Sequence, residues 1–159
     1  MKRFFLILNI FAVLTSCGST KSIPTTSVKS DLTKYNYVYV IPTSAVTSGI
    51  FIETSTVNPS EMISGYLMKK GYSLLPAINN ELAQKTFIVS YGNTGSTSFS
   101  SSLVAKKKVL IQFSDAETHE IIASSEAEGT SLNTETEALV QAIKRALDSI
   151  FDLNKLPIN

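Results

Sequence analysis

The sequence predicts an α+β fold, in which an antiparallel or mixed sheet of four or five strands carries two helices packed on one face. Two patterns lead to this prediction. Several short segments alternate apolar and polar residues, as strands do, and two longer segments repeat their apolar residues at helical spacing. The chain has 159 residues, of which 43% are apolar, and this is enough for one domain with a buried core.

The N-terminus has the pattern of an export signal. Lys2 and Arg3 precede an apolar run over residues 4–14 that only Asn9 interrupts. A helix of this length would span about 16 Å, against about 30 Å for the hydrocarbon core of a bilayer. The run is therefore too short to cross a membrane and is typical of a secretory signal peptide.

The only cysteine of the chain follows this run. Leu14-Thr15-Ser16-Cys17 consists of an aliphatic residue, two small residues and cysteine, and it resembles the lipobox of bacterial lipoproteins. The resemblance implies that residues 1–16 are removed as a signal peptide, that the Cys17 sulfur carries a diacylglycerol and that the new amine is acylated. The alternative is an ordinary signal peptide whose cysteine lies near the cleavage point.

The lipid on Cys17 would make the membrane a partner of this protein. Two or three acyl chains hold a protein firmly at a bilayer, whereas one chain binds only reversibly. In Gram-negative lipoproteins, aspartate after the cysteine often signals retention in the inner membrane, and here Gly18 stands in its place. The resemblance therefore implies a lipid-anchored protein of the outer membrane, with its globular part on the periplasmic face.

Residues 17–33 are expected to form the lipidated cysteine and a flexible tether. The segment is rich in serine and threonine and shows no apolar periodicity. A flexible chain of this length has an r.m.s. span on the order of 20–24 Å. We therefore expect a single α+β domain over residues 34–159 that stays close to the membrane.

The domain is expected to begin with a strand and a helix. Residues 36–41 alternate and are followed by Pro42, which predicts a strand. Asn58-Pro59-Ser60-Glu61 supplies an N-cap, a proline at the first helical position and an acid in the first turn. These signals and the stop at Gly71 predict a helix over residues 59–70.

The remaining elements are shorter strands, a long hairpin and a last helix. Strands are expected over residues 72–75 and 86–91, a helical turn over 79–84, a polar loop over 92–102, and an amphipathic helix over 135–152.

The long hairpin is expected over residues 103–114 and 120–128. Only an even register brings the apolar residues of both strands to the core side, because a slip by one residue turns every side chain over. In this register each of two exposed lysines lies opposite a glutamate of the partner strand: Lys108 opposite Glu126, and Lys106 opposite Glu128.

Several segments also match a known family. They are LMKKGYSLL at 67–75, TFIVSYG at 86–92, the hairpin at 109–129 and the helix end at 147–151. Together with the Tyr-rich first strand and the element order, they resemble the bacterial lipoprotein family catalogued as domain of unknown function 4136. That family usually has glycine in the hairpin turn, where His119 stands here. The resemblance implies this fold and a place in the cell envelope, and it implies no activity.

The composition excludes several classes of function. The chain has 14 basic and 13 acidic residues, a formal charge of +1, which does not suit a nucleic-acid binder. One cysteine and one histidine leave too few ligands for a zinc site or a disulfide framework. We therefore expect no catalytic residues, no metal and no cofactor, and nucleic acid is not an expected partner.

Two acidic groups are candidate sites of chemistry. Glu126 and Glu128 share one strand face about 7 Å apart, a spacing at which paired carboxylates can hydrolyse glycosides. A catalytic pair needs one acid in an apolar pocket, whereas these two face lysines. The DAETHE sequence around His119 reads as a solvated hairpin turn. A hydrolase acting on an envelope polymer is therefore the alternative rather than the main hypothesis.

The main hypothesis rests on three tyrosines. Tyr35, Tyr37 and Tyr39 line one side of the first strand, opposite the side expected to face the core. Tyrosine gives a large contact area for little lost entropy, so this side is a candidate binding surface for an envelope protein or glycan. The alternatives are that the segment 43–57 folds over the tyrosines, or that they are ordinary packing on a sheet that is covered on both sides. We expect a non-enzymatic binding or assembly accessory, and the sequence leaves its oligomeric state open.

Overall fold

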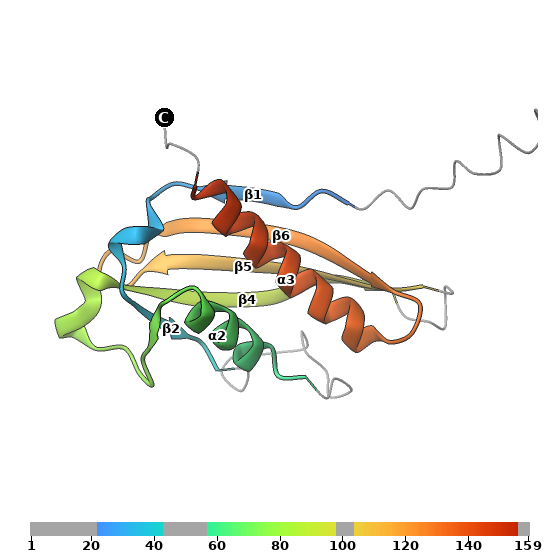
Figure 1. The fold of residues 1–159 in the computed structure, drawn as a ribbon, viewed down its shortest axis with the longest axis horizontal. Coiled ribbons are helices and arrows are strands. Elements are labelled where there is room, and N and C mark those ends of the chain that lie inside the picture. Colours follow the sequence, from blue (N-terminus) through green and yellow to red (C-terminus); the bar gives the residue numbers. More distant parts are fainter. Residues whose placement is uncertain (1–21, 43–56, 98–103, 156–159) are drawn as a thin grey trace, which may run out of the picture.

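The computed structural model describes residues 22–42, 57–97 and 104–155. Within them it contains one mixed sheet of six strands with two α-helices packed on the same face (Figure 1). The strands are β1 (Thr25–Val28), β2 (Tyr37–Val40), β3 (Ser73–Leu74), β4 (Thr86–Thr97), β5 (Ala105–Asp115) and β6 (Ile121–Ser131). The helices are α2 (Pro59–Lys69) and α3 (Glu135–Leu153), with short 3-10 helices η1 (Leu32–Lys34) and η3 (Asn80–Lys85). The α+β prediction is confirmed, with six strands in the order β1-β6-β5-β4-β2-β3 rather than four or five.

The additional strand, β1, lies in the segment that was expected to be a tether. It pairs antiparallel with β6 at the edge of the sheet. The Thr26 hydroxyl lies 2.7 Å from that of Ser125 and 2.6 Å from that of Ser149, so it joins β1 to both β6 and α3. The prediction of a flexible tether over residues 17–33 is therefore wrong from Thr25 onward, because a backbone ladder and hydroxyl contacts attach this polar segment to the domain.

The expected hairpin is formed by β5 and β6. Its register is even, as predicted, but it is shifted by two residues, so Lys108 lies opposite Glu128 rather than Glu126. Both predicted ion pairs still form, but each joins residues that are diagonal neighbours across the hairpin rather than directly opposite each other. Lys108 Nζ lies 2.7 Å from Glu126 Oε2, and Lys106 Nζ lies 3.9 Å from Glu128 Oε1.

The strand β4 is twice as long as expected. It was expected to end at Tyr91, and it continues through residues 92–97, where a polar loop was predicted. The continuation pairs with β5 across an irregularity between Asn93 and Gly95. Pairing with a long neighbouring strand thus overrides the local preference of these polar residues for a loop.

Both α-helices begin where the capping signals placed them. The Asn58 side chain accepts a hydrogen bond from the Ser60 N–H at α2, and Gly71 follows this helix with a φ of 97°. The Thr134 hydroxyl accepts from the Glu137 N–H at 3.0 Å and begins α3. None of the helices in the described segments is both long and apolar enough to cross a membrane.

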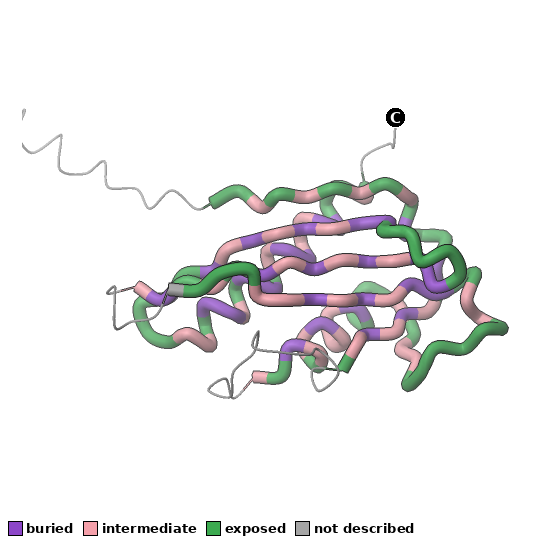
Figure 2. Tube along the Cα trace, turned by 180° about the vertical axis from the view of Figure 1, so that it is seen from behind, coloured by how far each residue is buried: buried purple, intermediate pink, exposed green. Residues whose placement is uncertain are grey.

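The core lies between the sheet and the two helices. The apolar side chains of β2, β4 and β5 that point to the helices are buried, among them Val38, Phe87, Ile111 and Phe113. At the β6 end the packing is so close that a Cβ at Gly129 would lie 1.9 Å from the Ala138 carbonyl oxygen and 2.6 Å from the Ala142 nitrogen of α3. The opposite face of the sheet carries neither helix (Figure 2).

Candidate functional site

The face of the sheet turned away from the helices is the candidate binding surface, and we call it the open face. Its side chains alternate with the buried ones along each strand and are half-buried (Figure 2). The open face comprises Tyr37, Tyr39, Ile88, Ser90, Leu110, Gln112, Ser114, Ser124, Glu126 and Glu128. It therefore combines aromatic and aliphatic side chains on β2, β4 and β5 with hydroxyl and carboxylate groups on β6.

Two of the three predicted tyrosines lie on the open face. Tyr39 pairs with Ile88 across the parallel β2–β4 ladder, and Tyr37 lies next to β3 and β4 near the start of β2. Val38, between them, is fully buried on the helix side, as expected. The alternative, that the segment 43–57 covers these tyrosines, falls almost wholly outside the described residues.

The third tyrosine, Tyr35, is not part of this surface, and that part of the prediction is wrong. Its side chain is 3% exposed and packs edge-on against Phe87, with ring centroids 5.6 Å apart. Its hydroxyl donates a hydrogen bond to Asp115 Oδ2 at 2.7 Å. The alternation fails here because β2 begins only at Tyr37, and the chain arrives from η1 on the helix side of the sheet.

The buried Asp115 anchors the β5–β6 turn as well as Tyr35. Its Oδ1 accepts hydrogen bonds from the Glu117 and Thr118 N–H groups, at 2.8 and 3.0 Å. Burial would raise the pKa of this carboxyl, but these hydrogen bonds, the one from Tyr35 and the charge of Lys34 together hold it below its usual range. Burial, and then the carboxylate beside it, raise the pKa of the Tyr35 hydroxyl.

The predicted turn at His119 is confirmed. Residue 119 has a φ of 60°, a left-handed conformation that glycine adopts without strain. The side chain is exposed, and the backbone N–H of His119 donates a hydrogen bond to the Asp115 carbonyl oxygen at 2.9 Å. The described residues contain no group of three or more histidine, cysteine, aspartate or glutamate side chains that could hold a metal ion.

The two carboxylates of β6 on the open face, Glu126 and Glu128, each form an ion pair with a lysine side chain of β5. Glu126 accepts from the Thr94 hydroxyl at 2.7 Å as well as pairing with Lys108. The hydrogen bond from Lys108, followed by the one from Thr94, lowers the pKa of Glu126. A general acid for glycoside hydrolysis needs a raised pKa, so this arrangement is suited to charge pairing rather than to proton donation.

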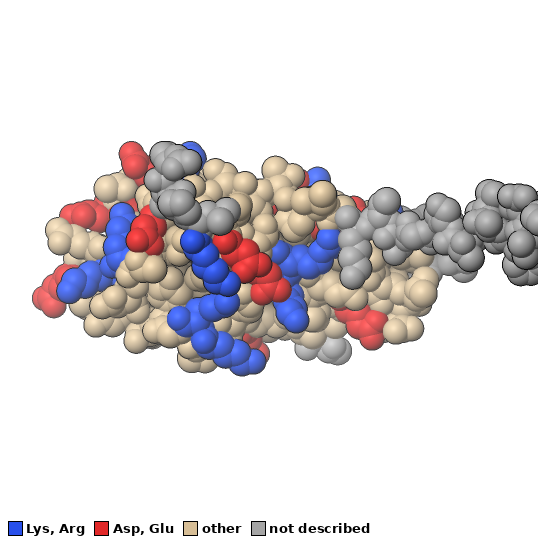
Figure 3. Space-filling view, turned by 45° about the horizontal axis from the view of Figure 1, so that its top comes forward, with Lys and Arg blue, Asp and Glu red and all other residues tan. Residues whose placement is uncertain are grey.

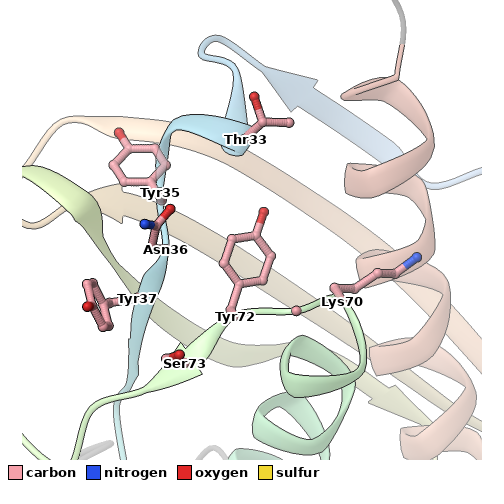
Figure 4. A pocket seen from close by; sticks show the side chains of 8 residues that line it. Thr33, Tyr35, Asn36, Tyr37, Lys70, Tyr72 and Ser73 are labelled. Carbon is pink, nitrogen blue, oxygen red and sulfur yellow. The ribbon is translucent and has the colours of Figure 1, made fainter.

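A polar hollow lies beside the start of β2, and the sequence did not indicate it. It encloses about 460 Å³ and is lined by Thr33, Tyr35, Asn36, Tyr37, Lys70, Gly71, Tyr72 and Ser73 (Figure 4). Its residues come from η1, β2 and the connection from α2 to β3. They meet because β3 pairs parallel with β2, a contact that no local pattern encodes.

These features define an α+β protein in which, over the residues that the structure describes, both α-helices cover one face of the sheet and neither covers the other. Comparison with family models found no match, and comparison with curated proteins found none either. Among solved structures the chain is similar to a PelC variant from Paraburkholderia phytofirmans, with a TM-score of 0.59, 11% identity, and coverage of 81% of this chain and 98% of that one. A second PelC structure from the same organism has a TM-score of 0.58, 12% identity and the same coverage. At these identities the likeness shows a shared fold.

Proposed function

We propose that this protein is a lipid-anchored accessory of the cell envelope that binds or assembles through the open face and performs no catalysis. The anchor is Cys17, and the location is the periplasmic face of the outer membrane. One observation carries the binding role: Tyr37 and Tyr39 stand half-exposed on a sheet face that neither helix covers. Aromatic side chains on a rigid strand lose little entropy on binding, which suits them to recognition.

The bound partner is an envelope protein, a glycan or a further copy of this chain. The two PelC structures are described as dodecamers, and this favours copies of the chain as the first partner to test. The open face, with Ile88 next to Tyr39 and with Leu110 further along β5, also offers apolar area to a protein surface.

The alternative is a hydrolase acting on an envelope polymer, with the β6 carboxylates as its site. It requires an acid that stays protonated near neutral pH. The lowered pKa of Glu126 and the lysine beside each carboxylate favour the binding role instead.

The anchor is tested by replacing Cys17 with serine. Without the thiol no thioether to diacylglycerol can form, so the variant should incorporate no labelled fatty acid and should lose its attachment to the outer membrane. Cell fractionation with detergent extraction and fatty-acid labelling measure both effects. Ser16→Ala, which keeps a small residue before the cysteine, is the control and should behave as the wild type. Retention of Cys17→Ser in the membrane fraction would refute the anchor.

The binding role is tested by the double variant Tyr37→Ala/Tyr39→Ala. We expect the detergent-solubilised wild type to sediment as an assembly and the double variant to shift toward the monomer, because the aromatic contact area is lost. Met68→Ala removes an exposed apolar side chain from α2, on the other side of the sheet, and should leave the assembly unchanged. Unchanged sedimentation of the double variant, together with unchanged capture of proteins and glycans from envelope extract, would refute the open face as a binding surface.

A further inference from the structure

The start of the described chain is fixed to the middle of α3. The Arg145 guanidinium donates hydrogen bonds to the Glu128 carbonyl on β6 and to the Ser22 carbonyl ahead of β1. Three residues further on, β1 begins its ladder with β6. One side chain therefore joins Ser22 to the last strand, β6, and to the last helix, α3, and the chain is held to the domain from Ser22 onward.

This attachment leaves a short connection to the anchor. Only residues 18–21 lie between Cys17 and Ser22. A fully extended chain spans at most about 3.6 Å per residue, so Ser22 lies within about 18 Å of Cys17. If the sulfur carries lipid, as the proposed function requires, the end of the domain around Ser22 must face the bilayer closely.

Two strongly exposed apolar side chains lie at the same end. Ile23 is 90% exposed and Leu132 is 72% exposed, the highest values among the large apolar residues of the described segments. Leu132 directly follows Ser131, the last residue of β6. Arg145 joins Ser22 to Glu128, which lies near the end of the same strand. In Figure 1 the β6–α3 connection lies at one end of the long axis, the segment that leads into β1 runs along the upper edge toward that same end, and η3 lies at the opposite end.

We propose that this end, formed by Ile23, Leu132 and the residues around Ser22 and called the anchor end below, rests against the phospholipid surface. The inference rests on the proposed lipid anchor and adds an orientation to it. The long strands of the sheet lie along the line from the anchor end to the β5–β6 turn. In this orientation they stand upright on the membrane, and the open face is perpendicular to the membrane surface. Neighbouring molecules in the same membrane can then meet through their open faces.

The contact with lipid is apolar rather than electrostatic. Lys/Arg and Asp/Glu side chains are mixed on the surface near β1 and α3, with no extended patch of one sign (Figure 3). A protein with mixed charges gains little from anionic headgroups, for which clustered basic residues are needed. The exposed Ile23 and Leu132 side chains are suited instead to the boundary between headgroups and acyl chains.

The test compares two single labels on the full acylated protein. Leu132→Cys places a fluorophore at the anchor end, and Ile78→Cys places it on an exposed apolar position near η3. The thioether at Cys17 leaves only the introduced thiol to react. The proteins are reconstituted into vesicles of phosphatidylethanolamine and phosphatidylglycerol that contain a lipid with a headgroup quencher. We expect several-fold stronger quenching at 132 than at 78.

A linker insertion and mass spectrometry separate the two levels of the proposal. Inserting about 20 glycine and serine residues after Gly18 should bring the two quenching values together, because the longer tether no longer fixes the orientation. A ratio unchanged by the insertion would overturn the role of the short connection. Equal quenching at 132 and 78 in protein that carries fatty acid would overturn the orientation alone. Mature protein without fatty acid would overturn both this inference and the proposed anchor.

Discussion

Replacing Gly129 with alanine should destabilise the fold more than the same change at Gly65, Gly71 or Gly95. The new Cβ would lie 1.9 Å from the Ala138 carbonyl oxygen and 2.6 Å from the Ala142 nitrogen, far inside contact distance. Both are backbone atoms, so no side-chain rotation relieves the clash, and α3 must move away from β6. We expect a loss of about 3 kcal/mol or more in the free energy of unfolding, and a fall in Tm of about 10 °C.

Urea and thermal unfolding of the full chain measure this effect, with Gly65→Ala as the matched control. Gly65 lies inside α2, and a Cβ there meets no atom within 4 Å. Alanine is the better helix former, so this variant should be more stable by about 0.5–1 kcal/mol. Equal stability of the two variants would show that β6 and α3 do not pack as closely as the structure has them.

Replacing Asp115 with alanine should have the second largest effect. The change removes the acceptor of the buried Tyr35 hydroxyl and of two N–H groups in the β5–β6 turn. A buried donor left without a partner costs more than the net worth of its hydrogen bond, and bonds to a charged acceptor are the stronger ones. We expect a loss of about 2–4 kcal/mol in the free energy of unfolding. Asp152→Ala, at an exposed ion pair with Lys155, should change stability little.

The same carboxyl gives the stability a pH dependence of known sign. Its pKa in the folded protein is lowered, so its contribution is fully present above the unfolded-state pKa of about 3.9 and is lost as the pH falls through the folded value. The stability difference between the wild type and Asp115→Ala should therefore shrink on acidification below about pH 4. Unfolding curves at several pH values measure it, and a difference that stays constant would contradict the assigned role of the charge.

The elements with strong local signals could be predicted from the sequence. The N-cap at Asn58 and the glycine at position 71 delimit α2, and the apolar period of α3 survives intact in the structure. The even register of the hairpin also follows from local alternation, because only one face of each strand is apolar. The exact register does not follow, since a shift by two residues leaves the same side chains on the same faces.

The parts that depend on distant pairing could not be predicted. β1 has no apolar alternation of its own, and its place is set by a strand about one hundred residues away. Tyr35 obeys the alternation of β2 in sequence but is turned into the core by η1 and Asp115. Gly129 reads as a turn residue in isolation, and only the approach of α3 shows why a side chain cannot stand there. The polar hollow beside β2 was missed for the same reason.

The fixing of Ser22 by Arg145 also bears on the order in which this chain acquires its structure. A polypeptide is synthesised from its N-terminus, so β1 has no partner until β6 and α3 have followed it, since Thr26 meets Ser149 across 123 positions. Contacts of such long sequence separation form late and slowly. Until then the outer edge of β6 remains available to any other strand, a hazard for aggregation during biogenesis. The first segment of the described chain to be synthesised is thus the last to pair, and its pairing with β6 completes the sheet.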